Sequence, residues 1–81
     1  MTVHVQFWSF FKDLAGCAEE RIDVPAQTTV GQLQDLVAQR HPRLAGLRGS
    51  TLIAVGVDYQ PASHVLQDGD QVSIFPPVQG G

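Results

Sequence analysis

Helical periodicity occurs in one segment of this 81-residue sequence, and it limits the folds open to the chain. Pro42 stops any such helix by about His41, and Thr29 and Gln32 have the spacing of a capping box at its start. The apolar residues of the segment recur at spacings of three and four and share one side of the helix: Val30, Leu33, Leu36 and Val37. We expect one amphipathic helix of about three turns.

Most of the remaining chain has the apolar alternation or the short apolar runs typical of strands. Pro61 confines the fourth expected strand to a sheet edge, and Asp68, Gly69 and Asp70 predict a tight turn before the fifth. Residues 10–18 and 43–50 are expected to be loops, with Leu44 and Leu47 closing the edge of the core. The expected strands span residues 2–9, 21–24, 51–55, 57–60 and 71–75.

The order strand, strand, helix, strand, short strand, strand predicts an α+β fold. The first two strands should form an antiparallel hairpin, and the helix should cover one face of a mixed sheet of about four to five strands, the β-grasp roll. We expect one domain over residues 1–75. Pro76 and Pro77 lack amide donors and favour extended chain, so residues 76–81 are expected to form an extended, flexible tail ending in Gly80-Gly81.

Composition excludes several classes of function. The formal charge is −3 and the basic residues are scattered, so the chain lacks the basic stripe of a nucleic-acid-binding protein. A single cysteine, Cys17, excludes an internal disulfide framework and any multi-cysteine metal site within one chain. The alternating N-terminal residues differ from a signal peptide, and no apolar run approaches the roughly 18 residues of a membrane span. We expect no membrane association and a cytoplasmic location.

No internal set of side chains predicts catalysis or a metal site. Cys17 lies in an expected loop without a paired base, so we interpret it as a small loop residue. Glu19 and Glu20 are adjacent and point to opposite faces of a strand, so they form no carboxylate dyad and are expected to be solvated. The three histidines lack ligand spacing and are interpreted as surface or capping residues: His4, His41 and His64.

The C-terminal end has a different chemistry. Fully extended, residues 76–81 reach about 20 Å, enough to place a carboxylate deep inside another protein. A terminal carboxylate with a pKa of about 3.5 is ionised at neutral pH and resists attack until it is activated, for example as an acyl-adenylate. Gly80 and Gly81 carry no side chains and allow close approach in a crowded active site. An inert, frayed tail is the alternative interpretation.

Three stretches of the sequence resemble one known family. They are residues 54–55 (Ala-Val), residues 66–72 (Leu-Gln-Asp-Gly-Asp-Gln-Val) and residues 75–81 (Phe-Pro-Pro-Val-Gln-Gly-Gly). With the opening strand and loop over residues 7–16, they are similar to the small subunit of molybdopterin synthase, within the MoaD/ThiS group of ubiquitin-like sulfur carriers. The most specific part is residues 68–81. One departure is Gly56, where family members commonly have asparagine.

This resemblance implies a non-catalytic subunit that carries sulfur on its C-terminus. An E1-like adenylyltransferase would adenylate Gly81 with ATP and magnesium, and a sulfur donor protein would convert the adenylate to a thiocarboxylate. The large subunit of molybdopterin synthase, as a dimer holding two carriers, would then use the sulfur to build the dithiolene of molybdopterin. The chain itself would hold no cofactor.

The predicted site residues lie at and near the tail. Gly81 would carry the reacting carbonyl, and the residues that let it pass are Val78, Gln79 and Gly80. Phe75, Pro76 and Pro77 would fix where the tail leaves the domain and contact the partner. Phe75 is equally consistent with simple core packing. Trp8, on the sheet face opposite Val3, would add an exposed apolar contact or only cover the rim of the sheet.

Three alternative functions remain open at this point. The sulfur recipient could be a thiazole, cysteine or transfer RNA, although the Phe-Pro-Pro-Val sequence of residues 75–78 resembles the molybdopterin branch more than the thiamine branch. The chain could instead be a protein modifier attached to lysines through Gly81. It could also be a plain β-grasp binding module with an inert tail.

Overall fold

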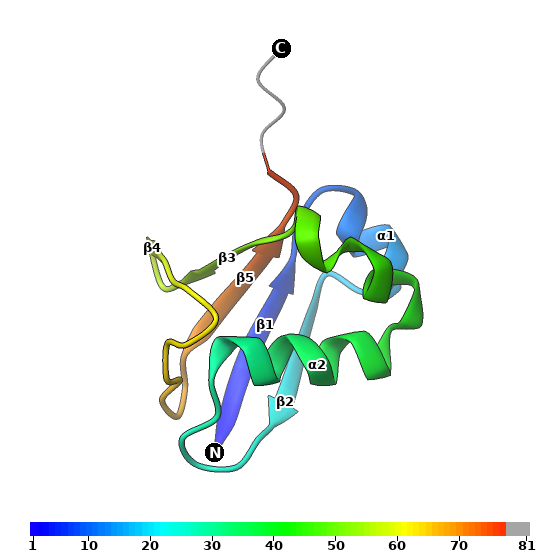
Figure 1. The fold of residues 1–81 in the computed structure, drawn as a ribbon. Coiled ribbons are helices and arrows are strands. Elements are labelled where there is room, and N and C mark those ends of the chain that lie inside the picture. The colour runs from blue at the N-terminus through cyan, green and yellow to red at the C-terminus, as the bar shows by residue number, and fades with distance from the viewer. Residues whose placement is uncertain (78–81) are drawn as a thin grey trace.

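Five strands form one mixed sheet with the main helix on one face, in the order β2-β1-β5-β3-β4 (Figure 1). The computed structural model describes residues 1–77. The strands are β1 (Thr2–Phe7), β2 (Glu19–Asp23), β3 (Leu52–Val55), β4 (Asp58–Tyr59) and β5 (Gln71–Phe75). The helices are α1 (Phe10–Ala15), α2 (Val30–Arg40) and the 3₁₀ helix η1 (Pro42–Ser50). The predicted β-grasp fold is confirmed.

The strand β5 lies at the centre of the sheet. It pairs in parallel with β1 and antiparallel with β3, so first and last strands of the chain are neighbours. β1 and β2 form the expected antiparallel pair, and β4 is the expected short edge strand. The last strand, β5, has the predicted bounds. Because β5 is paired with a strand on each side, the position of its last residue, Phe75, is fixed relative to the rest of the domain.

The core lies between the sheet and α2. Alternate residues of the strands face α2, whose own Val30, Leu33 and Val37 are buried. Thr29 caps the helix as predicted: its hydroxyl accepts from the Gln32 amide, and the Gln32 side chain accepts from the Thr29 amide. The strand residues on the core face are Val3, Val5, Phe7, Ile22, Ile53, Val72 and Ile74.

Two segments predicted as loops are helical instead. Residues 10–15 form α1, and its Phe11 is 1% exposed and belongs to the core. Six residues are too few to repeat a helical period, so the sequence pattern did not reveal this helix. Residues 42–50 form η1, a 3₁₀ helix that places Leu44 in the core, with Leu47 packed against it.

Some strand ends also differ from the predicted ones. β1 stops at Phe7 and not at residue 9, because Ser9 has a φ of 56° and turns the chain into α1. β2 begins at Glu19, two residues earlier than predicted, and ends at Asp23. No helix of the described residues is long and apolar enough to cross a membrane.

Candidate functional site: the base of the tail

The base of the predicted tail, which we define as Phe75, Pro76 and Pro77, lies at the end of β5. Figure 1 shows this end of the molecule beside α1 and η1, opposite the N-terminus. The amide of Trp8 donates to the carbonyl of Ile74 at 3.0 Å, so the β1–β5 ladder continues almost to the base. Because β5 is paired on both sides, the base has a fixed position on the domain.

Pro76 and Pro77 are half-buried against the two short helical segments. They line a hollow whose other walls come from the start of α1 and the end of η1: Ser9, Phe10, Phe11, Leu47 and Ser50. The ring of proline restricts its φ angle, and the contacts of these two half-buried prolines further restrict the direction in which the chain leaves β5. The base of the tail therefore leaves the sheet between α1 and η1.

Next to this base, the outer face of the sheet carries an apolar patch. We define the outer patch as Trp8, Val57, Tyr59 and Phe75, which line one shallow hollow together with smaller residues of β3, β5 and the turn between β3 and β4. Trp8 is 51%, Tyr59 67% and Val57 96% exposed. Large apolar side chains gathered on an exposed surface are typical of a protein-binding surface.

The strand register explains why Phe75 belongs to this outer face. Ile74, its neighbour in β5, pairs with Phe7 and Ile53 and is 3% exposed in the core. Successive residues of a strand point to opposite faces, so Phe75 points away from α2. It contacts the Tyr59 ring of the edge strand, with ring centroids 5.8 Å apart. Phe75 is therefore not a core residue, and the core-packing alternative is wrong.

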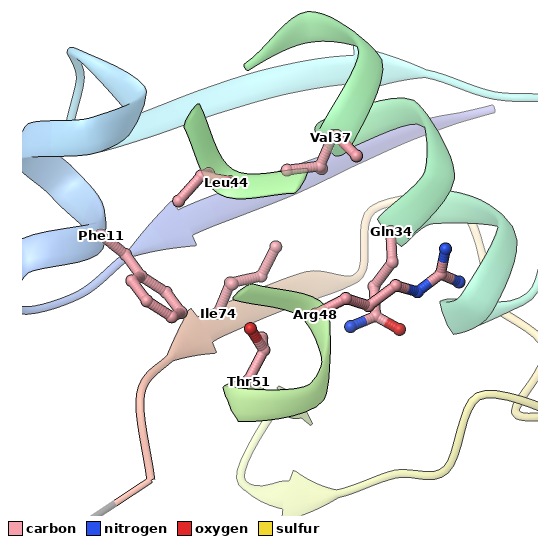
Figure 2. A pocket seen from close by; sticks show the side chains of 8 residues that line it. Phe11, Gln34, Val37, Leu44, Arg48, Thr51 and Ile74 are labelled. Atoms are coloured by element: carbon pink, nitrogen blue, oxygen red, sulfur yellow. The ribbon is translucent and has the colours of Figure 1, made fainter. Parts of the chain in front are cut away.

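The hollow between η1, α2 and the sheet is too small for a cofactor. Figure 2 shows it lined by Phe11, Gln34, Val37, Leu44, Arg48, Thr51 and Ile74. Its volume is about 30 Å³, room for a water molecule or two, whereas small-molecule sites measure about 300–1,000 Å³. This hollow, which the exposed Arg48 borders, offers no place for a pterin or a nucleotide.

The structure brings together the predicted partner-binding residues that it describes. Trp8 and Phe75 share the outer patch, and Pro76 and Pro77 follow directly from it. Four predicted residues lie outside the described residues, so their roles stay predictions: Val78, Gln79, Gly80 and Gly81. Sequence reasoning missed Tyr59 and Val57. Their segment was expected to be an edge strand. A strand of only two residues gives too short a pattern to predict the pairing register that places Tyr59 beside Phe75.

The internal polar residues differ in part from expectation. His41 caps the end of α2, as a capping histidine would. Glu20, predicted to be solvated, instead makes an ion pair with Arg40 and lies 2.9 Å from His41 Nε2. Burial and the Glu20 carboxylate raise the pKa of the Cys17 thiol. A nucleophilic thiol needs the opposite shift, so Cys17 is not an activated nucleophile.

Comparison with known proteins finds similarity over nearly the whole chain. The family model described as "ThiS family" matches residues 5–81. The human molybdopterin synthase sulfur carrier subunit is 33% identical over 98% of this chain and 93% of its own length.

Two solved structures extend the similarity to the fold. A Pyrococcus furiosus protein described as a putative molybdopterin converting factor, subunit 1, is 31% identical over 96% of this chain and 99% of its own, with a TM-score of 0.90. A chain from a Helicobacter pylori complex of subunits 1 and 2 of molybdopterin-converting factor is 26% identical over the full length of both chains, with a TM-score of 0.72. The chain therefore belongs to the ThiS family of ubiquitin-like β-grasp proteins, among relatives that are molybdopterin synthase sulfur carrier subunits.

Proposed function

We propose that this chain is the sulfur carrier subunit of a molybdopterin synthase and that Gly81 carries the sulfur as a thiocarboxylate. The observation that carries the proposal is the placement of the outer patch directly beside the base of the tail. A partner that covers the patch would receive the tail from a fixed point. Residues 1–75 would then act as the docking domain and residues 76–81 as the arm that enters the partner.

The reaction sequence at Gly81 would require two partner proteins. A carboxylate oxygen of Gly81 attacks the α-phosphate of ATP in an E1-like adenylyltransferase with magnesium, and pyrophosphate leaves. Sulfide-level sulfur (HS⁻) released by a sulfur donor protein then attacks the carbonyl carbon of Gly81, the bond to AMP breaks and AMP leaves, and the released proton goes to solvent, which gives a thiocarboxylate in place of the carboxylate. Adenylation is needed because the free carboxylate is ionised at neutral pH and is a poor electrophile.

The recipient in this proposal is the pterin precursor held by the large subunit. The human relative is a molybdopterin synthase sulfur carrier subunit, and the Helicobacter pylori relative forms a complex of subunits 1 and 2. Both support a large-subunit partner for this chain. Two carriers on a large-subunit dimer would deliver the two sulfurs of the dithiolene, and the large subunit would supply the catalytic side chains.

Reconstitution tests the identity of the recipient. The thiocarboxylated chain is mixed with the large subunit from the same organism and the cyclic pyranopterin precursor, and dithiolene formation is measured together with the return of Gly81 to a carboxylate. We expect about two carriers consumed for each molybdopterin formed, since the dithiolene holds two sulfurs. A chain lacking Gly81 should give no product while still folding.

The alternative functions give different results in the same system. A carrier for another recipient would form the thiocarboxylate but transfer no sulfur to the pterin. A protein modifier would yield lysine conjugates in a lysate supplied with ATP. An inert binding module would keep its partner affinity when Gly81 is deleted and would never acquire sulfur.

A further inference from the structure

Three potential metal ligands from separate segments meet on the helix side of β2. Cys17 follows α1, Glu20 lies on β2, and His41 follows α2. The ligand atoms of all three lie within 4.8 Å of one another, and all three residues are partly buried. Glu20 faces inward because it alternates with the buried Ile22 along β2. The fold therefore gathers a thiol, a carboxylate and an imidazole at one point.

The two oxygens of the Glu20 carboxylate have different partners. Oε1 lies 2.9 Å from His41 Nε2, whereas Oε2 accepts from the Arg40 guanidinium, including its Nε at 3.2 Å. The Oε1 atom and the imidazole nitrogen thus face each other near the thiol. Arg40 can keep its hold on Oε2 while Oε1 binds a metal, as outer-shell partners of ligating carboxylates do.

The positions of the ring and of the carboxylate are fixed by their surroundings. The His41 ring packs edge-on against Phe7 of the core, with centroids 5.4 Å apart. Side-chain exposure is 14% for His41 and 19% for Glu20 in their pair. Ligands that are held in place before binding lose little conformational entropy when they bind.

The donor set selects the class of metal. Sulfur, imidazole nitrogen and one carboxylate oxygen suit zinc and similar divalent transition metals, whereas calcium and magnesium prefer sets made only of oxygen. Three protein ligands leave the fourth tetrahedral position for water. We propose that Cys17, Glu20 and His41 bind one divalent cation of the zinc class.

Binding would exchange protons in a defined way. The Cys17 thiol releases its proton to solvent and the sulfur bonds to the metal, while neutral His41 and ionised Glu20 each donate a lone pair. A thiol without a bound metal is mostly protonated at neutral pH, because its ordinary pKa is about 8.5. The positive charge of Arg40 opposes the cation. Loss of at least one proton per metal bound is therefore expected.

The test is a titration of the tag-free, full-length chain with Co²⁺ alone, followed by competition with Zn²⁺. One equivalent of Co²⁺ should give thiolate-to-cobalt charge-transfer absorption and the intense visible bands of tetrahedral cobalt, and Zn²⁺ should abolish both. The melting temperature should rise with added Zn²⁺, because a ligand that binds the folded state stabilises it.

Two variants at the site and one outside it decide the outcome. Cys17→Ser should remove the charge-transfer band and weaken binding by more than the roughly 10–100-fold loss seen for outer-shell partners. His41→Gln should also weaken binding, whereas His64→Gln, outside the cluster, should bind like the parent chain. Far-ultraviolet circular dichroism of the metal-free variants checks that each one folds. Absence of the charge-transfer band in the parent chain, or equal binding by folded Cys17→Ser, would overturn the proposal.

Discussion

The rings of Tyr59 and Phe75 lie 5.8 Å apart, at 43° to each other, on the outer face of the sheet. Tyr59 comes from the edge strand β4, and Phe75 is the last residue of the central strand β5. Their contact places an exposed aromatic surface beside the two prolines that begin the tail. The proposed docking surface and the proposed reactive arm are therefore joined at one residue, Phe75.

Truncating Trp8 should weaken binding to the large subunit and leave the fold intact. Its side chain is about half exposed in the outer patch, so Trp8→Ala should cost well under half of the roughly 3–5 kcal/mol lost when a fully buried aromatic side chain is truncated. Aromatic residues that anchor the centre of an interface cost about 2 kcal/mol or more when truncated, so affinity should fall by roughly tenfold or more. Calorimetric titration measures the affinity. Val65→Ala, a comparably exposed position outside the patch, is the control, and an equal loss for both variants would contradict the assignment.

Two adjacent phenylalanines in α1 should differ sharply in their effect on stability. Phe11 is 1% exposed in the core, whereas Phe10 is 50% exposed. Phe11→Ala should lower the free energy of unfolding by about 3–5 kcal/mol, because it removes buried surface and leaves a cavity. Phe10→Ala should cost well under half as much. Urea unfolding followed by circular dichroism compares the two, and similar losses would mean that α1 is not docked as described.

The capping box at the start of α2 should contribute a measurable part of the stability. Thr29→Ala removes the hydroxyl that accepts from the Gln32 amide at 3.2 Å and should cost about 1 kcal/mol. Thr29→Ser keeps a hydroxyl and should cost much less. If both substitutions have the same effect in thermal unfolding, the cap contributes nothing and the methyl group of Thr29 accounts for the loss.

Glu20 should stabilise the metal-free fold only above acidic pH. The Arg40 hydrogen bonds, with help from His41 and against the cost of burial, hold the Glu20 pKa below its ordinary value of 4.5. The unfolded chain therefore takes up this proton at a higher pH than the folded chain does. The contribution is present above pH 4.5 and is lost as the pH falls through the lower folded pKa.

The matched variant for this effect is Glu20→Gln, studied with a chelator present. Urea unfolding should show it less stable than the parent chain at neutral pH, and the difference should shrink as the solution is made more acidic. A difference that stays constant down to the acid transition would show that the ion pair with Arg40 does not bias the protonation of Glu20.

Regular alternation and capping were sufficient to predict the framework of this fold from sequence. β1, α2 and β5 carry repeated apolar patterns or a capping box, and Gly69, with a φ of 84°, occupies the predicted turn. α1 was missed because six residues hold less than two turns, and its burial depends on Phe11 meeting the core. The predicted end of β1 differs because the turn at Ser9 has no sequence signature.

Sequence predicted the members of the candidate site that local patterns mark, but not those that tertiary pairing brings to it. Phe75 was predicted as a contact from its place at a strand end and Trp8 from its place on the sheet face opposite Val3, and the structure puts both in one patch. Tyr59 joins them through the pairing of β4 with β3, which is a tertiary choice. The meeting of Cys17, Glu20 and His41 likewise depends on how α2 ends above β2, which residue spacing does not encode.

The most direct test of the sulfur-carrier proposal is intact-mass spectrometry of the chain after incubation with the adenylyltransferase of the same organism, ATP, magnesium and a sulfur source. The proposal predicts a mass gain equal to the exchange of one oxygen for one sulfur, dependent on ATP and absent when Gly81 is deleted. The adenylyltransferase must be shown to act on another carrier in the same mixture. An unchanged mass under those conditions would contradict the proposal.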